Sequence, residues 1–209
     1  MGFIVTRGDT LARMTQRIVI VGAGSQGAIV ADILERAGTP AIGFVDDTPG
    51  KNVLGTIDDL RTIEHDAIIV AVGDNRKRRE VVEKLAGENL ATAIHPFTSI
   101  AASARIGEGS MISAGAIVLP NAVIGRSVIL NTKASVDHDS VVGDFAHASA
   151  GSTIGAKVHI GEETLIAAGA TVASGMTVGA RSVIGAGAVV VRDVPDDVTA
   201  FGVPARVRS

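Results

Sequence analysis

The sequence contains no cysteine, no tryptophan and no tyrosine, and only five of its 209 residues are phenylalanine. Without cysteine the chain can form no disulfide, no thiolate metal site and no cysteine nucleophile. The scarcity of aromatic side chains suits a core of small stacked aliphatic residues, for which a hydrophobic content of 46% is ample. A net charge of −3 gives no electrostatic basis for binding nucleic acid or an anionic membrane.

The sequence also lacks any apolar run that approaches the roughly 20 residues of a membrane-spanning helix. A secretory signal is not expected, because Asp9 interrupts the first residues and no adequate apolar segment follows it. Residues 1–15 carry no strong pattern and Met14 offers an alternative start, so we expect a disordered leader there. We therefore predict a cytoplasmic protein.

A strict repeat of six residues runs from Ile100 to Val190. Every sixth residue is Val, Ile or Leu at fifteen of sixteen positions, and Ala148 is the exception. Four residues after each of the first fifteen of these positions, from Ala104 to Ala188, the residue is Ala, Ser or Thr at twelve. Neither the helical period near 3.6 nor the strand period of 2 explains this pattern, whereas a hexapeptide repeat is a signature of a parallel β-helix. We predict this fold for residues 96–194, with residues 195–209 as a closing tail.

A strand, a glycine turn and a helix are predicted in succession before the repeat. Residues 18–21 form a short apolar run, and a GxGxxG sequence at residues 22–27 follows it directly. The helix is expected over residues 25–36, ended by Gly38. Its buried face is predicted to carry three aliphatic residues, namely Ile29, Ile33 and Leu34.

A second and a third strand are predicted at residues 41–45 and 67–72. The second ends in Asp46 and Asp47, near where an acidic side chain reaches a ribose hydroxyl in dinucleotide sites. The third runs into Gly73, and a helix over residues 76–86 is expected to follow, with Asn75 as its N-cap. The basic run at residues 76–79 is predicted to form a solvated helix face.

These elements predict a Rossmann-like α/β domain over residues 16–95. It is short for a two-half dinucleotide fold and corresponds to one mononucleotide-binding half. Glycines allow the backbone to approach a phosphate, and the helix N-terminus supplies N–H donors and partial positive charge. Two alternatives remain: a glycine turn that only connects strand to helix, and NAD as the ligand.

Two of the five histidines lie in a suggestive setting within the repeat. His138 falls between the inward positions Val136 and Val142, so its side chain is expected to point outward beside Asp139. His147 follows nine residues later, which is half of an 18-residue coil, so the two rings lie at similar height on different sides of one prism. We therefore expect them to meet only across a subunit interface about a threefold axis. The other three are expected to be structural or exposed: His65, His95 and His159.

The sequence resembles the hexapeptide-repeat acetyltransferases that act on sugar nucleotides and sialic acids, typified by bacterial UDP-4-amino-sugar N-acetyltransferases. The resemblance covers nearly everything after residue 16. It is carried by the short Rossmann-like domain and by four motifs, at residues 73–75, 131–139, 147 and 202–206. It implies a left-handed β-helix with three hexapeptides per coil, a homotrimer, and acetyl-CoA as co-substrate with no metal. It also implies transfer of an acetyl group to the amine of a nucleotide-linked amino sugar for surface glycan or glycoprotein biosynthesis.

The same resemblance implies roles for individual residues. His138 would be the general base, Asp139 would raise its basicity, and His147 of a neighbouring chain would contact acetyl-CoA. The backbone at Ala168 and Ala186 would contact the coenzyme, and 18 residues between them place both in one column. The nucleotide sugar would be bound by six residues, namely Gly24, Ser25, Gln26, Asp46, Asp47 and Gly73. Gln26 departs from the family pattern, which usually has histidine at this position.

The chemistry of these residues is consistent with acyl transfer. A positioned histidine contributes about 10²- to 10⁴-fold to such reactions, and a carboxylate beside it fixes its tautomer. Because the chain has no cysteine, we expect direct attack by the sugar amine. Alternatives are O-acetylation of sialic acid, N-acetylation of a GDP-linked amino sugar, a metal-dependent hydratase of the γ-carbonic-anhydrase type, and a non-catalytic nucleotide-binding scaffold.

Overall fold

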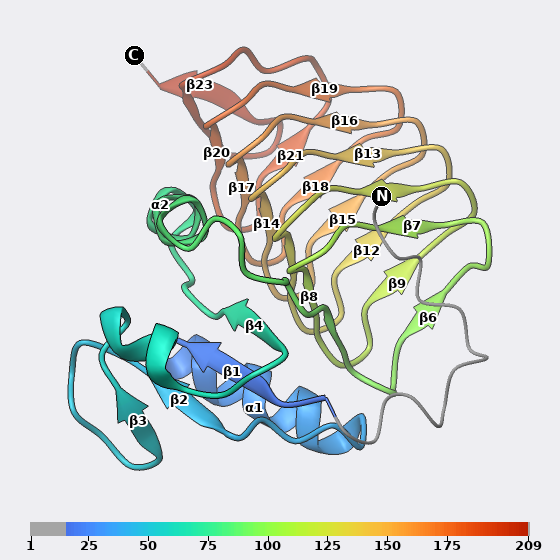
Figure 1. Ribbon diagram of the computed structural model, residues 1–209. Coiled ribbons are helices and arrows are strands. Elements are labelled where there is room, and N and C mark those ends of the chain that lie inside the picture. Colours follow the sequence, from blue (N-terminus) through green and yellow to red (C-terminus); the bar gives the residue numbers. More distant parts are fainter. Residues whose placement is uncertain (1–15, 209) are drawn as a thin grey trace.

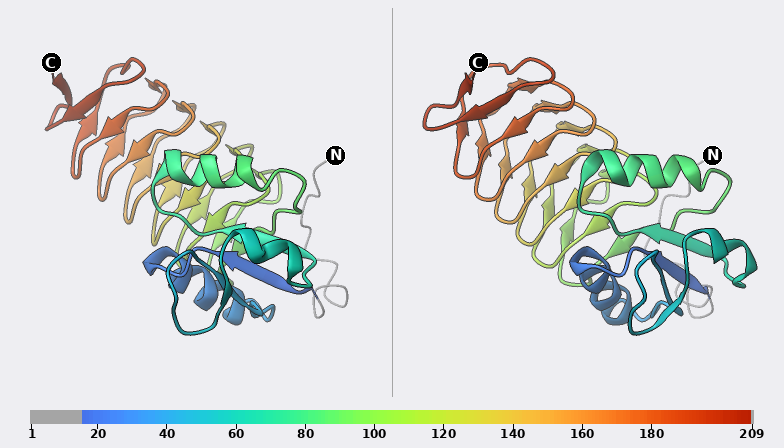
Figure 2. Two further views of the ribbon diagram at one scale, coloured as in Figure 1. Left: turned by 60° about the vertical axis from the view of Figure 1, so that its left-hand side comes forward. Right: turned by 90° about the vertical axis from the view of Figure 1, so that its left-hand side faces the viewer.

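The structure is a computed structural model that describes residues 16–208, so the leader expected over residues 1–15 lies outside the described residues. It consists of a small α/β domain packed against the lower coils of a triangular β-helix, as Figures 1 and 2 show. The chain runs from the α/β domain into the bottom coil and climbs to the C-terminus at the top of the prism. This confirms the predicted fold class.

The α/β domain has a four-stranded parallel sheet in the order β3-β2-β1-β4. Its strands are β1 (Ile18–Val21), β2 (Gly43–Val45), β3 (Val53–Gly55) and β4 (Ala67–Val70). Helix α1 (Ser25–Arg36) covers one face, and the 3₁₀ helix η2 (Asp58–Thr62) and helix α2 (Asn75–Lys84) cover the other. The strands at β1 and β4 were predicted, whereas β3 and η2 were not, because both are too short and irregular to give a periodic signal.

Three sequence expectations about this domain are wrong. Ile29 is 38% exposed, and α1 instead buries Val30 together with the polar Gln26, because the helix packs against the β-helix as well as its own sheet. The N-cap of α2 is Asp74, whose carboxylate accepts the N–H of Lys77 at 2.8 Å, and not Asn75. The basic run is not wholly solvated, since Arg78 is fully buried.

The β-helix has three faces of short parallel strands that pair in register with the strands 18 residues away. The first face contains β5 (Ala93–Ile94), β8 (Met111–Ile112), β11 (Ile129–Leu130), β14 (His147–Ala148), β17 (Leu165–Ile166), β20 (Val183–Ile184) and β22 (Thr199–Phe201). The second contains β6 (Ser99–Ile100), β9 (Ile117–Val118), β12 (Ser135–Val136), β15 (Thr153–Ile154), β18 (Thr171–Val172) and β21 (Val189–Val190). The third contains β7 (Arg105–Ile106), β10 (Val123–Ile124), β13 (Val141–Val142), β16 (His159–Ile160) and β19 (Thr177–Val178).

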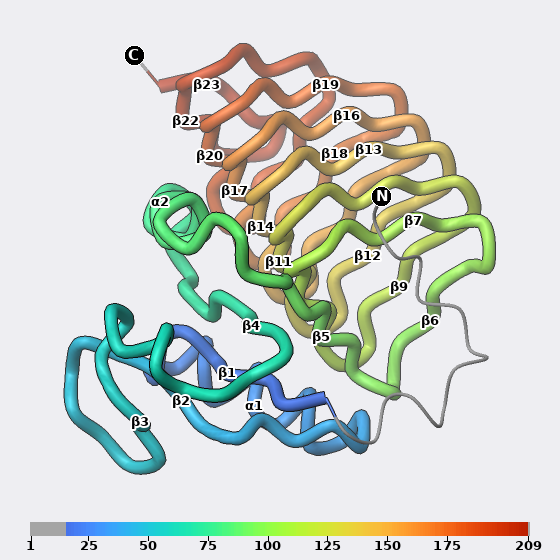
Figure 3. Tube along the Cα trace, viewed as in Figure 1, coloured from blue at the N-terminus to red at the C-terminus, as the bar shows by residue number. Residues whose placement is uncertain are grey.

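The coils stack into a left-handed solenoid of about six turns, which Figure 3 shows as successive rungs. This is more than the five coils of the repeat at residues 100–190, because β5 starts the first face one hexapeptide earlier and β22 extends it. Strand β23 (Arg206–Arg208) pairs antiparallel with β22 and covers the upper edge. The aliphatic residue at the end of each strand points inward, and the small residues between strands fill the corners of the core. We call the turns after the first, second and third faces the first, second and third corners.

Two apolar clusters join the α/β domain to the β-helix. On the α1 side, Met111 and Ile129 of the first face pack with residues of β1, β4 and α1. On the α2 side, Phe145 from the third corner packs with Val82 and the opposite face of the sheet. All three β-helix residues are buried, which fixes the glycine turn and the loop after β4 beside the first face.

Candidate active site

The glycine turn after β1 contains two glycines that the fold requires and one that faces open space. Gly22 has φ +105°, a conformation that favours glycine. A Cβ at Gly27 would lie 2.1 Å from the carbonyl oxygen of Gly22, so helix and strand can approach only without a side chain there. At Gly24 a Cβ would meet nothing within 4 Å, and the same is true of Gly73. Both predicted ligand-binding glycines therefore have open surroundings.

The N-terminus of α1 is available to an anion. The first intrahelical bond runs from the N–H of Ala28 to the carbonyl of Gly24 at 3.0 Å, so the N–H groups of residues 25–27 have no intrahelical acceptor. The first turn of α1 contains no acidic residue. Of the predicted ligand residues here, Gln26 turns away from the open side: it is buried, and its amide nitrogen lies 3.6 Å from Met111 Sδ.

The two aspartates after β2 bond to nearby backbone. Asp46 accepts the N–H of Ala23 through Oδ2 and the N–H of Thr48 through Oδ1, each at 2.7 Å. These bonds, first of all the one from Ala23, lower the pKa of Asp46. Asp47 accepts the N–H of Ile57 at 3.2 Å. Asp46 thus holds the glycine turn in place, and its remaining lone pairs stay available to a hydroxyl group.

The loop after β4 meets His147 within the same chain. The His147 ring lies close to the backbone of Gly73. Burial, reinforced by the charge of Arg78, lowers the pKa of His147 to about 4, so the ring is neutral at physiological pH. Its Nε2 is enclosed and has no partner among residues 16–208. Gly73 and His147, which the sequence assigned to two different ligands, are therefore neighbours.

Arg78 connects the segments that carry Gly73 and His147, and the sequence did not identify it as a site residue. It is fully buried, and its guanidinium donates to the carbonyl groups of Val72, Ser127 and Phe145 at 2.9, 2.9 and 2.6 Å. Longer contacts reach the carbonyls of Gly73 and Ala146 at 3.3 and 3.4 Å, and a further bond reaches the side chain of Asn75 at 2.9 Å. Burial lowers the pKa of Arg78 to about 10 and leaves it charged. One side chain thus ties the loop after β4 to the segment that precedes His147.

His138 and Asp139 lie at the second corner and point outward, as predicted. Nδ1 of His138 is 2.8 Å from Oδ2 of Asp139, and the other carboxylate oxygen accepts the amide of Asn121 at 2.9 Å. Asn121 lies 18 residues earlier, one coil below, and both it and Asp139 have φ near +60°. The bonds from His138 and Asn121 lower the pKa of Asp139. Nε2 of His138 has no hydrogen-bond partner among residues 16–208, and the side chain is 47% exposed.

Ala168 and Ala186 stack on the first corner, above Ala114, Thr132 and Ala150. Each rung bonds to the next, since Gly187 donates its N–H to Ala168 at 2.9 Å and Gly169 does so to Ala150 at 3.0 Å. Both predicted coenzyme-binding alanines are exposed. The second corner with His138 lies elsewhere on the prism, so a single chain does not bring His138 to this column, whereas His147 is on the adjoining first face.

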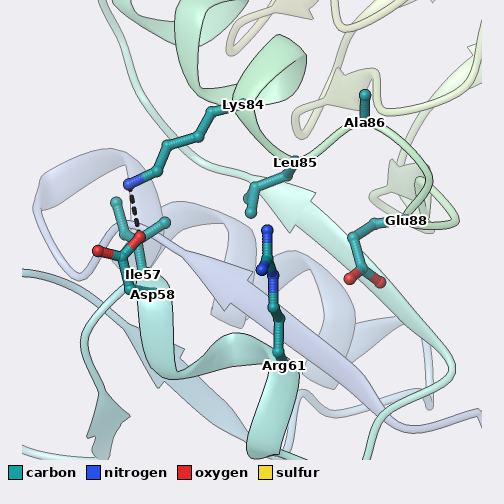
Figure 4. Close-up of a pocket in the computed structure, with 7 residues that line it drawn as sticks. All are labelled: Ile57, Asp58, Arg61, Lys84, Leu85, Ala86 and Glu88. Carbon is teal, nitrogen blue, oxygen red and sulfur yellow. Dashed lines mark ion pairs between the residues drawn. The ribbon is translucent and has the colours of Figure 1, made fainter.

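A separate pocket of about 180 Å³ lies between η2 and the C-terminal end of α2. Figure 4 shows it, with the ion pair between Lys84 and Asp58 at 2.7 Å and Arg61 on its floor. It contains none of the predicted site residues. In residues 16–208 no cluster of three or more His, Cys, Asp or Glu side chains could hold a metal ion, and no helix there has the length and apolarity to cross a membrane.

Comparisons with known proteins agree with this fold. The family of PglD N-terminal domains matches residues 17–85. A UDP-N-acetylbacillosamine N-acetyltransferase of Bacillus subtilis is 34% identical over 112 residues, which cover 47% of this chain and 52% of that protein. The matched region thus spans about half the length of this curated relative.

Solved structures match over nearly the whole chain. GDP-perosamine N-acetyl transferase from Caulobacter crescentus, as a histidine-to-alanine mutant in complex with CoA and GDP-perosamine, is 36% identical with a TM-score of 0.88, covering 92% of this chain and 97% of that one. The acetyltransferase domain of PglB from Neisseria gonorrhoeae, in complex with acetyl coenzyme A, is 38% identical with a TM-score of 0.89, covering 93% and 100%. The described fold, the glycine turn and the paired histidine and aspartate thus occur in a chain that belongs to the hexapeptide-repeat sugar N-acetyltransferase family.

Proposed function

We propose that this protein transfers the acetyl group of acetyl-CoA to the amine of a nucleotide-linked amino sugar. The observation that carries the proposal is the outward pair of His138 and Asp139, whose arrangement leaves one ring nitrogen free to take a proton. The relatives support the reaction class, since one is named for a UDP-linked and another for a GDP-linked amino sugar. Both nucleotide classes are therefore candidate acceptors.

In the proposed reaction the sugar amine attacks the thioester carbonyl directly. Nε2 of His138 takes a proton from the nitrogen as the C–N bond forms, and Asp139 stabilises the imidazolium through Nδ1. The C–S bond then breaks, the electron pair leaves with sulfur, and the proton on His138 returns to the CoA thiolate. The base therefore ends each turnover in its starting state.

The ligands are assigned to two regions of the chain. We assign the nucleotide sugar to the N-terminus of α1, which offers N–H donors to the diphosphate at Gly24 and Ser25. The assignment also includes Asp46, Asp47 and Gly73, whereas the buried side chain of Gln26 is not part of it. We assign acetyl-CoA to the first-corner column of Ala168 and Ala186, with His147 at its base. Since His138 lies on a different corner, the proposal requires a homotrimer in which one chain supplies His138 to a neighbour's column. We further propose that the reaction takes place in the cytoplasm.

A CoA-release assay tests the proposal. The protein is offered UDP- and GDP-linked 4-amino-4,6-dideoxy sugars, and free sialic acid as the alternative acceptor. We expect release with an amino-sugar nucleotide and a fall in kcat of about 100-fold or more in His138→Ala, with little change in the KM for acetyl-CoA. His159→Ala, an exposed histidine on the third face, is the matched control and should retain activity. Turnover of sialic acid alone, or normal turnover by His138→Ala, would refute the proposal.

A further inference from the structure

A column of polar residues runs along the second corner of the β-helix. Its members are 18 residues apart, so each lies one coil above the last: Ser103, Asn121, Asp139 and Lys157. The three upper members have φ between +57° and +62°, the left-handed backbone with which the chain turns this corner. Because stacked strands are about 4.8 Å apart, side chains that leave the same corner position on successive coils come within reach of one another. The column therefore allows one side chain to bond directly to the next.

The side chain of Asn121 connects the coil below to the carboxylate of Asp139. Its Nδ2 donates to Oδ1 of Asp139 at 2.9 Å, while Oδ2 of the same carboxylate lies 2.8 Å from Nδ1 of His138. Each carboxylate oxygen thus has one donor. The backbone joins the same two coils, since the N–H of Asp139 donates to the carbonyl of Pro120 at 3.1 Å. Asn121 is itself held from below, because its N–H donates to the hydroxyl oxygen of Ser103 at 3.1 Å.

The orientation of Asp139 decides which ring nitrogen of His138 carries the hydrogen. Hydrogen bonds from His138 and Asn121 lower the pKa of Asp139, so its carboxylate is ionised and can only accept. Nδ1 of His138 must then donate, which makes Nε2 of the neutral ring an acceptor, as a general base requires. The terminal torsion of an aspartate is only broadly defined, and this side chain is 42% exposed to water that competes for its oxygens. Asp139 therefore needs a second partner to keep Oδ2 on the imidazole.

The residue type at position 121 suits this task. Asparagine adopts the left-handed backbone more readily than most residues that have a side chain. Its amide donates a hydrogen without a charge, whereas a lysine or an arginine would compete with the imidazolium for the carboxylate. An aspartate would offer no donor and would place a second negative charge one coil below Asp139.

Two other charged groups of this corner act differently. Asp137 accepts the backbone N–H of His138 at 2.6 Å and so fixes the main chain of the histidine. Lys157 acts on Asp139 through its charge and not through a hydrogen bond, and it is the smallest of the causes that lower the pKa of that carboxyl. Orientation of the Asp139 side chain from the protein side is therefore left to Asn121.

We propose that Asn121 is a positioning residue for acetyl transfer, which acts through Asp139 to keep the hydrogen of His138 on Nδ1 and Nε2 ready to accept a proton. In this role Asn121 contacts Asp139 and no reacting atom. The kinetic consequence rests on the proposed function. The structural consequence, the tautomer of His138, is measured without any substrate, so failure of the inference and failure of the proposed function are distinguishable.

Nitrogen NMR of the labelled histidine rings in the full protein tests the tautomer. The His138 signals are assigned by their loss in His138→Ala. With the ring neutral, the hydrogen should be on Nδ1 in the parent protein, and Asn121→Gly should shift the signals toward a mixture of both tautomers. Glycine keeps the left-handed backbone and removes only the amide; Asn121→Ala gives the same readout if the glycine variant does not fold. The matched control is Asn52→Gly, because Asn52 has a φ of +61° in the turn before β3 and should leave the tautomer unchanged.

Steady-state kinetics with the amino-sugar nucleotide that gives the fastest CoA release test the consequence for turnover. Asn121→Gly should lower kcat about fivefold, the effect of one hydrogen bond, and leave the KM of both substrates unchanged. In Asp139→Ala, which has no carboxylate to orient, the same glycine substitution should cost nothing further.

Two results would overturn the inference. An equal loss of kcat in both backgrounds would show that Asn121 supports the corner and does not act through Asp139. An unchanged His138 tautomer in Asn121→Gly would overturn it on structural grounds alone. Absence of CoA release by the parent protein with every amino-sugar nucleotide would instead refute the proposed function and leave the tautomer measurement standing.

Discussion

Replacing Arg78 with methionine should destabilise this protein more than replacing any other basic residue of α2. The substitution keeps an unbranched apolar stem but removes a buried cation that bonds carbonyl groups on both domains. The Arg78→Met variant would leave the carbonyls of Val72, Ser127 and Phe145 in a dry environment with no donor. Arg76, in the same helix, has a side chain that is 83% exposed and pairs only with Glu80 within the described part of the chain, so Arg76→Met is the matched control.

The expected loss of stability in Arg78→Met follows from the hydrogen bonds that the substitution removes. Removing one partner from a buried charged network typically costs about 3–5 kcal/mol, because the remaining polar groups stay buried and unpaired. In a chain of this length 1 kcal/mol shifts Tm by roughly 2–4 °C, so we expect a decrease of about 6–20 °C for Arg78→Met. Arg76→Met should stay within about 0.5 kcal/mol of the parent protein.

Urea unfolding measures the free energy of unfolding of both variants, and differential scanning calorimetry measures their Tm. Arg78→Met and Asn75→Ala should be non-additive, since the two side chains share a hydrogen bond at 2.9 Å. Because Arg78 also fixes Gly73 beside His147, folded Arg78→Met should show a raised KM for the sugar nucleotide. A decrease in the free energy of unfolding of less than about 1 kcal/mol would refute the reasoning, because removing the buried cation leaves several buried carbonyl groups without a donor.

Four further predictions follow. Replacing both Asp46 and Asp47 with alanine should raise the KM for the sugar nucleotide and leave that for acetyl-CoA unchanged; an equal rise in both, measured in steady-state assays, would show that the ligands are misplaced. His147 has a folded pKa of about 4, below its ordinary value of 6.5, so the unfolded chain binds more protons between these values. Stability should therefore increase from pH 4 to pH 6.5 and level off above, and urea titrations of His147→Gln should show a weaker dependence in this window. Asn121→Ala should lower kcat about fivefold, the effect of one hydrogen bond, and unchanged kcat would remove Asn121 from the orientation of Asp139. Mixing His138→Ala with His147→Ala chains should restore part of the activity if both are impaired and subunits exchange, and failure under demonstrated exchange would contradict the shared site.

The sequence alone determined the β-helix and the outward position of His138. A period of six over sixteen repeats can be satisfied only by stacked coils, because each aliphatic residue must face the same interior. The alternation around Val136 and Val142 then dictates that His138 and Asp139 point to solvent. The strand, turn and helix at residues 18–36 were equally predictable, since Gly22 and Gly27 are required by local backbone geometry and close contact.

Only the tertiary structure decided how the two domains share a site. Residue spacing cannot show that Gly73 touches His147, because the contact depends on how the α/β domain docks against the first face. For the same reason the basic run of α2 looked solvated, although its third residue, Arg78, is enclosed by carbonyl groups from segments about 50 and 70 residues away. Local periodicity fixes which side chains face outward, whereas long-range packing fixes which of them meet.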